Sequence, residues 1–102
     1  MSNIIRGTTP TIKYMFRTVS VSDITVAYLT IRMDGELVIQ KDLADATIGD
    51  GFLAWTLTQE ETLALLKQNT SVMINWKTAA GLRGASKRTQ IIIERNDIEE
   101  VI

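Results

Sequence analysis

Residues 24–43, with the sequence ITVAYLTIRMDGELVIQKDL, predict a β-hairpin. The run from Ile24 to Met33 is rich in β-branched and aromatic side chains, which are favoured in strands. Asp34-Gly35 separates it from a second run of the same kind, and this dipeptide is among the strongest signals for a tight hairpin turn. The apolar side chains change phase near Tyr28, which predicts a β-bulge there or burial on both faces. We therefore expect two antiparallel strands joined at Asp34-Gly35.

Further short segments on both sides of this hairpin alternate between apolar and polar residues, and turn signals recur every 8–12 residues, as in β-sandwiches. The sequence predicts an all-β fold, an antiparallel and immunoglobulin-like sandwich of about seven strands with one short helix in a connection. An open barrel is the main rival. We expect a single domain spanning residues 1–102. The other expected strands are Thr11–Arg17, a short edge at Thr47-Ile48, Phe52–Leu57, Ser71–Thr78 and Lys87–Glu94.

One helix is predicted, and its start is encoded by Thr58-Gln59-Glu60-Glu61. In this capping box the Thr58 hydroxyl accepts from the backbone N–H of Glu61, while the Glu61 carboxylate accepts from the backbone N–H of Thr58. The pattern from Thr62 to Lys67 continues it for two or three turns over one end of the sheets. Asn69 is expected to end it.

The composition excludes several kinds of chemistry. The sequence has no histidine and no cysteine, so the usual near-neutral proton shuttle, thiolate nucleophiles, disulfides and common zinc sites are excluded. We expect no enzyme activity and no cofactor. Eleven basic residues against twelve acidic ones give a net charge of −1, which disfavours nucleic acid as a partner. No stretch approaches the roughly 20 apolar residues of a membrane span, so no membrane partner is expected.

The segment from Trp76 to Arg88 contains several basic residues and no acidic one. It indicates either a local anion contact or a solvated loop rim, and the rim is favoured because aromatic residues are not interleaved with the charges. Alternation places Trp76 with Val72 and Ile74, and so predicts a core position for it and, by the same reasoning, for Trp55. The basic residues that form this candidate surface are Lys77, Arg83, Lys87 and Arg88.

The end of the chain, from Glu94 to Ile102, is acidic with an apolar tip. It carries four carboxylates against one arginine. Ile98, Val101 and Ile102 are its apolar side chains, and they complete the candidate interaction surface. Two interpretations remain open, which are docking on a neighbouring subunit by strand addition and a frayed terminus.

Two segments resemble a known family. Residues 5–11, IRGTTPT, and residues 57–63, LTQEETL, are similar to those of small proteins encoded among the structural genes of phages and prophages of Gram-positive gut bacteria, generally near tail and baseplate components. Family members often have a glycine-containing hairpin followed by a small-residue segment before the last strand. Gly84-Ala85-Ser86 lies in the matching place, whereas the basic Lys87-Arg88 departs from the family pattern.

The resemblance implies a virion-associated structural protein, a tail or baseplate accessory that acts by protein–protein association. It implies a homo-oligomer or other phage structural proteins as partners, and a tail-associated location in the virion after synthesis in the host bacterial cytoplasm. No catalytic residues are carried over. Two alternatives stay open. One is a carbohydrate-binding or host-surface-binding sandwich, which needs exposed aromatic residues on a sheet face. The other is a small phage-encoded regulator that binds a host protein.

Overall fold

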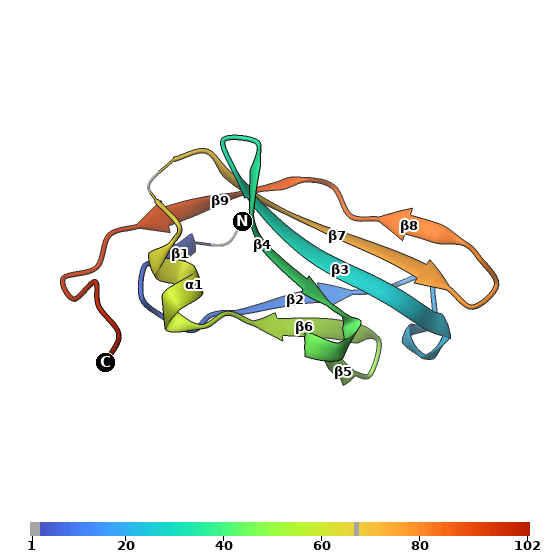
Figure 1. Cartoon of the computed structure of the whole chain (residues 1–102). Helices are drawn as coiled ribbons and strands as arrows, with labels where there is room; N and C mark the ends of the chain where they lie inside the picture. The colour runs from blue at the N-terminus through green and yellow to red at the C-terminus, as the bar shows by residue number, and fades with distance from the viewer. Residues whose placement is uncertain (1–2, 67) are drawn as a thin grey trace.

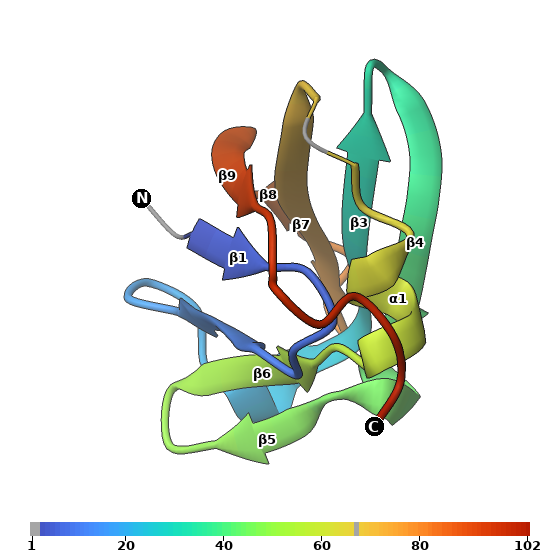
Figure 2. The ribbon, with the colours of Figure 1, turned by 90° about the vertical axis from the view of Figure 1, so that its left-hand side faces the viewer.

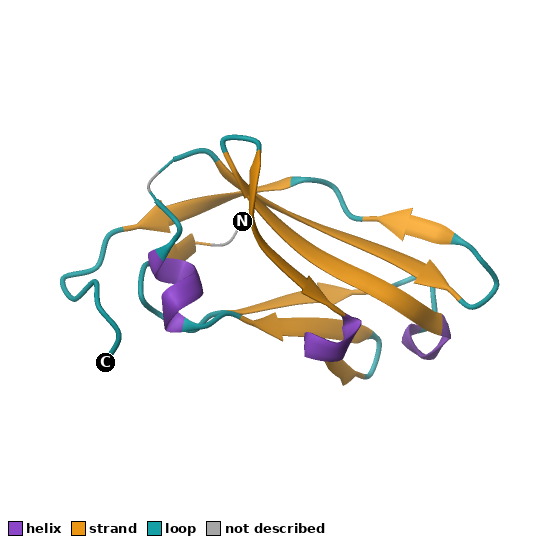
Figure 3. Ribbon diagram, viewed as in Figure 1, coloured by secondary structure: helices purple, strands orange, loops and turns teal. Residues whose placement is uncertain are grey.

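The computed structural model describes residues 3–66 and 68–102, which form strands in two layers and one short α-helix (Figures 1 and 3). Two short 3-10 turns, Val21–Asp23 and Leu43–Asp45, lie in connections. The other elements are β1 (Asn3–Ile5), β2 (Thr11–Met15), β3 (Ile24–Met33), β4 (Glu36–Asp42), β5 (Thr47–Gly49), β6 (Phe52–Thr56), α1 (Gln59–Leu63), β7 (Thr70–Thr78), β8 (Arg83–Ala85) and β9 (Thr89–Glu94).

The larger sheet has the strand order β1-β9-β7-β3-β4, with β8 paired to β7, and the smaller sheet has the order β2-β6-β5. Figure 2 shows the two sheets as separate layers. The predicted two-sheet β-sandwich with one short helix is confirmed. Two details of the prediction need correction, because the described residues form nine strands and because β1 runs parallel to β9, with Ile4 opposite Ile93. A strand of three residues is too short to be recognised by alternation, and its partner lies at the far end of the chain.

The order of the strands is that of an immunoglobulin domain. In such domains strands C, F and G form one sheet, variable-type domains add C′ to it, and B, E and D belong to the other sheet. Here β3, β7 and β9 take the places of C, F and G, β4 takes that of C′, and β2, β6 and β5 take those of B, E and D. The immunoglobulin-like topology predicted from the sequence is therefore present.

The β3–β4 hairpin forms as predicted. Asp34 and Gly35 have φ angles of 51° and 82°, and two consecutive positive values are what a type I′ turn requires. The change of apolar phase has its cause in an irregularity between Ile24 and Val26 in the pairing with β7, after which Ala27, Leu29 and Ile31 are buried. A second irregularity, between Ile31 and Arg32 in the pairing with β4, places its extra residue on β4. The bulges thus lie on either side of Tyr28, whose side chain is exposed on the outer face.

The core lies between the two sheets, and Trp55 is its largest fully buried side chain. Leu29 and Ile31 of β3 contribute from the larger sheet, and Leu53 and Trp55 of β6 from the smaller one, all with no exposed area. The indole N–H of Trp55 donates to the main-chain carbonyl of Asp42 at 2.9 Å, so the one polar atom of the ring is satisfied. The prediction that Trp55 belongs to the core is confirmed.

A cluster of aromatic side chains also links the two sheets. The ring centroids of Phe16, beside β2, and Trp76, on β7, are 4.9 Å apart at an interplanar angle of 86°, and Tyr14 lies 5.5 Å from Trp76. In antibody domains a disulfide joins the corresponding strands B and F. Gly84 of β8 passes close to the Trp76 ring, and a Cβ there would lie 2.5 Å from Cζ2 of the indole. Trp76 is half-buried in this cluster, as part of the inner face.

The helix begins where the capping box predicts and ends earlier than predicted. Glu61 N–H donates to the Thr58 hydroxyl at 3.1 Å, and Thr58 N–H donates to the Glu61 carboxylate at 2.8 Å. The helix then stops at Leu63 after little more than one turn. The chain turns there because Leu65 is drawn into the core, where it is fully buried. Lys67, the expected end of the pattern, lies outside the described residues, and Asn69 is in the loop before β7 and does not cap the helix.

Candidate interaction surfaces

The two segments that carry the family resemblance contact each other. The Arg6 guanidinium donates to the main-chain carbonyls of Leu65 and Leu63 at 2.8 and 2.6 Å. The Thr62 hydroxyl accepts from the N–H of Gly7 at 3.0 Å and donates to the carbonyl of Thr8 at 2.8 Å. Carbonyls at a helix C-terminus lack partners within the helix. Arg6 therefore caps α1 and ties it to the segment after β1.

The same arginine holds the C-terminal segment, residues 95–102. Arg6 forms an ion pair with Glu99, and the side-chain amide of Asn96 donates to the carbonyl of Arg6 at 2.9 Å. The far end is held by Gln59, whose side-chain carbonyl accepts from the N–H of Ile102 at 2.9 Å and whose amide donates to the Ile102 carbonyl at 3.3 Å. The segment is therefore not frayed within the domain, and it belongs to neither of the domain's own sheets, while docking on a neighbouring subunit stays a prediction.

Its three apolar side chains nevertheless face solvent. Ile98, Val101 and Ile102 are 52%, 55% and 87% exposed, although the backbone on either side of them is hydrogen-bonded to the domain. Ile98 and Ile102 line a shallow hollow together with Thr8 and Gln59. Figure 2 shows this segment crossing in front of the domain beside α1. We call Ile98, Val101 and Ile102 the apolar tail surface.

Two carboxylates in this region have lowered pKa values. The backbone N–H of Asn96 holds the pKa of Glu99 below its ordinary value, and the Arg6 guanidinium acts in the same direction, while desolvation opposes both. Burial raises the pKa of Glu61, but the hydrogen bond from the Thr58 N–H and the Lys41 ammonium, 3.1 Å away, together outweigh it, so the pKa is lowered. Both carboxylates are therefore ionised anchors near neutral pH.

The lowered pKa values of Glu61 and Glu99 make the stability of the folded protein depend on pH. A group whose pKa is lower in the folded state contributes stability above its unfolded pKa, near 4.3 for glutamate, and loses it as the pH falls through the folded value. We expect Glu99→Gln to destabilise the protein at pH 7 and to differ less from the wild type at pH 3. Urea denaturation at both pH values measures this, with the exposed Glu36→Gln as control. An equal difference at the two pH values would contradict it.

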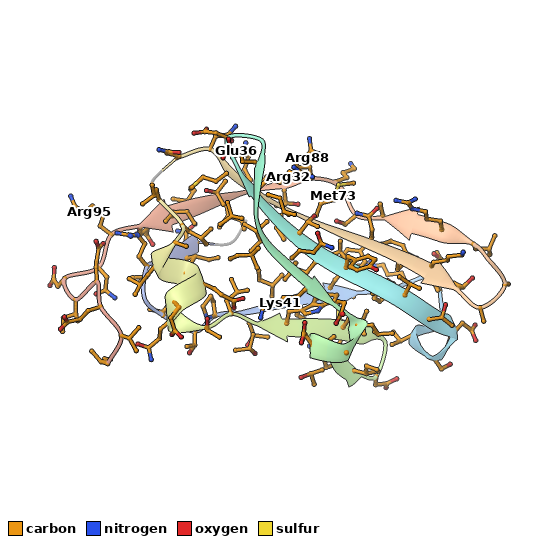
Figure 4. The ribbon with its side chains drawn as sticks, in the orientation of Figure 1. Arg32, Glu36, Lys41, Met73, Arg88 and Arg95 are labelled. Carbon is orange, nitrogen blue, oxygen red and sulfur yellow. The ribbon has the colours of Figure 1, made fainter. Side chains whose placement is uncertain are left out.

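A second surface lies on the outer face of the larger sheet. Three shallow hollows adjoin there, since Arg32, Ser71 and Arg88 line both the first and the second, and Asn75 lines both the second and the third. Figure 4 shows Arg32, Arg88 and Met73 close together on this face. We call this row of hollows the basic groove. Its remaining lining residues are Gly35, Asn69 and Gln90 at one end, Thr30 and Met73 in the middle, and Val26, Tyr28, Trp76, Lys77 and Arg83 at the other end.

The groove contains three of the four basic residues predicted from the sequence, which are Lys77, Arg83 and Arg88, and none of its lining residues is acidic. Lys87 is exposed in the loop between β8 and β9. Sequence reasoning missed Arg32, which reaches the groove from β3 and whose guanidinium donates to the Gly35 carbonyl at 2.9 Å. Its place on the outer face follows from alternation with the buried Ile31, but its nearness to Arg88 depends on the β3–β7 pairing.

Of the two tyrosines and two tryptophans, only Tyr28 has an exposed side chain. Tyr28 is 40% exposed on the outer face, whereas Trp55 is fully buried, and Tyr14 and Trp76 are half-buried against each other. A carbohydrate-binding sandwich needs exposed aromatic side chains on a sheet face. Only Tyr28 is available in this role on the larger sheet.

Within residues 3–66 and 68–102, no helix is long and apolar enough to cross a membrane. The same part of the chain holds no group of three or more histidine, cysteine, aspartate or glutamate side chains placed to bind a metal ion.

The strand order defines an immunoglobulin-like domain, and the absence of cysteine means that it has no disulfide. No protein-family model matches the chain, and no significant match was found among curated proteins. Among solved structures it is similar to extracellular domains 3–5 of Drosophila OTK, at 17% identity over 92% of this chain with a TM-score of 0.41, and it spans 31% of that chain. It is also similar to the V domain of amphioxus IgVJ-C2, at 13% identity over 90% of this chain and 98% of that chain, with a TM-score of 0.37.

Proposed function

We propose that this protein is a phage or prophage structural component, a tail or baseplate accessory that acts by binding other protein subunits. Its partners are further copies of itself or other phage structural proteins, and it is made in the host cytoplasm and incorporated into the virion. The resemblance of residues 5–11 and 57–63 supports the phage assignment. Their direct contact gives those two segments a shared structural role, which is to hold α1 and the C-terminal segment in place.

The observation that carries the proposal is the apolar tail surface. Exposed apolar side chains on a disordered end do not indicate a binding surface, because they are hydrated and mobile in the free protein. Here Arg6 and Gln59 fix the backbone on which Val101 and Ile102 are presented. A fixed apolar surface loses less conformational entropy on binding than a flexible one. The arrangement is that of a surface prepared for association.

Exchange of the exposed apolar side chains tests the proposal. We expect Val101→Ser/Ile102→Ser to weaken association by at least about tenfold, since burial of one such side chain contributes about 1.5–3 kcal/mol and tenfold corresponds to about 1.4 kcal/mol. The measurement is size-exclusion chromatography with light scattering, alone and with purified tail and baseplate proteins from the same genome. Leu82→Ser is the matched control, because Leu82 is 69% exposed in the loop before β8.

Two results would refute the proposal. One is a wild-type protein that stays monomeric at high concentration and binds none of the tail or baseplate proteins. The other is an equal loss of association in the Leu82 control, which would show that any exposed apolar side chain produces the effect.

A further inference from the structure

We propose that the basic groove is the docking site for the acidic C-terminal segment of a second copy of this chain, so that copies associate head to tail. The inference rests on the proposed function and names the partner. It is carried by charge complementarity between two surfaces of one molecule. The acidic side of this contact consists of Glu94, Asp97 and Glu100, and we call these residues the acidic end.

The groove is built for carboxylates. Arg32 is oriented by its hydrogen bond to the Gly35 carbonyl, and Arg88 and Ser71 line the same two hollows as Arg32. A guanidinium presents a planar fork of donors that matches a carboxylate, and it does so best where no competing acid is present. Lys77 and Arg83 extend the positive charge to the other end. Neither arginine of the first two hollows forms an ion pair with any described acidic residue.

The acidic end offers the matching groups. Glu94, Asp97 and Glu100 are exposed, and none of them forms an ion pair within residues 3–66 and 68–102. Glu99 is already occupied by Arg6 and is left out of the contact. The apolar Val101 and Ile102 follow directly in the sequence, and the groove also has an apolar part, with Val26 and Tyr28 beside the basic residues. The acidic and apolar parts of one surface thus both have counterparts on the other.

The geometry makes the contact intermolecular. Arg6 and Gln59 hold the C-terminal segment against α1, at the end of the domain where Figure 4 places Arg95 and away from Arg32 and Arg88. Two different patches that meet between copies form a heterologous interface, which generates rings or filaments. Such a contact fits a symmetric tail assembly.

A peptide fits the groove better than a nucleic acid. Single-stranded nucleic acids are held by aromatic side chains on which successive bases stack. Tyr28 is the one tyrosine or tryptophan that is exposed on this face, and a chain with a net charge of −1 has no long-range field to attract a polyanion. The groove is instead lined between its charges by hydroxyl and amide side chains such as Ser71 and Asn75, which suit a polypeptide backbone.

Charge exchange tests the proposal. The first variant, Arg32→Glu/Arg88→Glu, reverses the charge of two groove residues. The second variant, Glu94→Arg/Asp97→Arg, reverses the charge of two residues of the acidic end. Each alone is expected to reduce self-association in low salt by at least about tenfold, because like charges then face each other. An equimolar mixture of the two is expected to associate again, since each reversed surface then meets a complementary one. Sedimentation velocity measures all three samples, and circular dichroism checks that each variant is folded.

The control Lys13→Glu/Arg17→Glu changes the net charge by the same amount on the β2 side of the domain and is expected to associate like the wild type. Wild-type association should also weaken as the ionic strength rises. A mixture that stays monomeric would overturn the inference, as would groove variants that associate normally or a wild type that binds a single-stranded oligonucleotide in place of itself. If only Val101→Ser/Ile102→Ser disrupts association, the proposed function stands and this inference fails.

Discussion

Trp55→Ala is expected to lower the free energy of unfolding by about 3–5 kcal/mol, the range for removing a large aromatic side chain from a core. Trp55 is fully buried between the sheets, so its removal leaves a cavity that Leu29 and Leu53 of the two sheets can fill only in part. It also leaves the Asp42 carbonyl without the indole N–H that donates to it. Urea unfolding followed by circular dichroism measures the loss.

Two further variants separate the causes. Trp55→Phe keeps an aromatic ring and loses the hydrogen bond, and it should cost less than Trp55→Ala. Ile48→Ala removes an apolar side chain that is 60% exposed on β5, and it should change the stability by less than about 1 kcal/mol. If Trp55→Ala proved as mild as Ile48→Ala, the core would lie elsewhere and the two-sheet packing described above would be wrong.

Arg6→Met is expected to lower the free energy of unfolding by about 2–4 kcal/mol, because two main-chain carbonyls lose a charged donor. These are the carbonyls of Leu63 and Leu65, where α1 ends and the chain turns into the core. The substitution also leaves Glu99 without its ion-pair partner. The C-terminal segment should then be released from the domain, which we expect to appear as faster amide exchange at residues 96–102.

Arg6→Lys is the matched control for this prediction. A lysine keeps the charge and can pair with Glu99, but it lacks the planar fork that reaches several acceptors at once. Its loss of stability and its amide exchange should lie between those of the wild type and Arg6→Met. Unchanged exchange at residues 96–102 in Arg6→Met would show that the segment is held by other contacts and would remove the basis for a presented apolar tail surface.

Features set by neighbouring residues could be predicted from the sequence. The hairpin turn at Asp34-Gly35 follows from backbone conformations that only a few residue types adopt easily. The start of α1 follows from the reciprocal bonds of Thr58 and Glu61. Alternation correctly placed Trp55 inside. In each case the signal lies within a few residues of the feature that it predicts.

Features set by distant pairing could not be predicted. The parallel contact of β1 with β9 joins residues about 90 positions apart, and the sequence of neither strand indicates which strand it pairs with. The contact of Arg6 with Glu99 also joins residues that are far apart in the sequence, and so does the contact of Arg32 and Arg88 with the same hollow. The short end of α1 was missed because the burial of Leu65 outweighs helix propensity, which is a weak local preference. The candidate surfaces depend on these long-range contacts.

The central claim, that this protein is a structural component of a phage particle, is tested most directly by quantitative mass spectrometry of purified particles. Particles released after prophage induction are expected to contain the chain in a fixed ratio to a tail or baseplate protein, as symmetric assembly requires. A chain that is abundant in the induced cells and absent from the purified particles would contradict the claim.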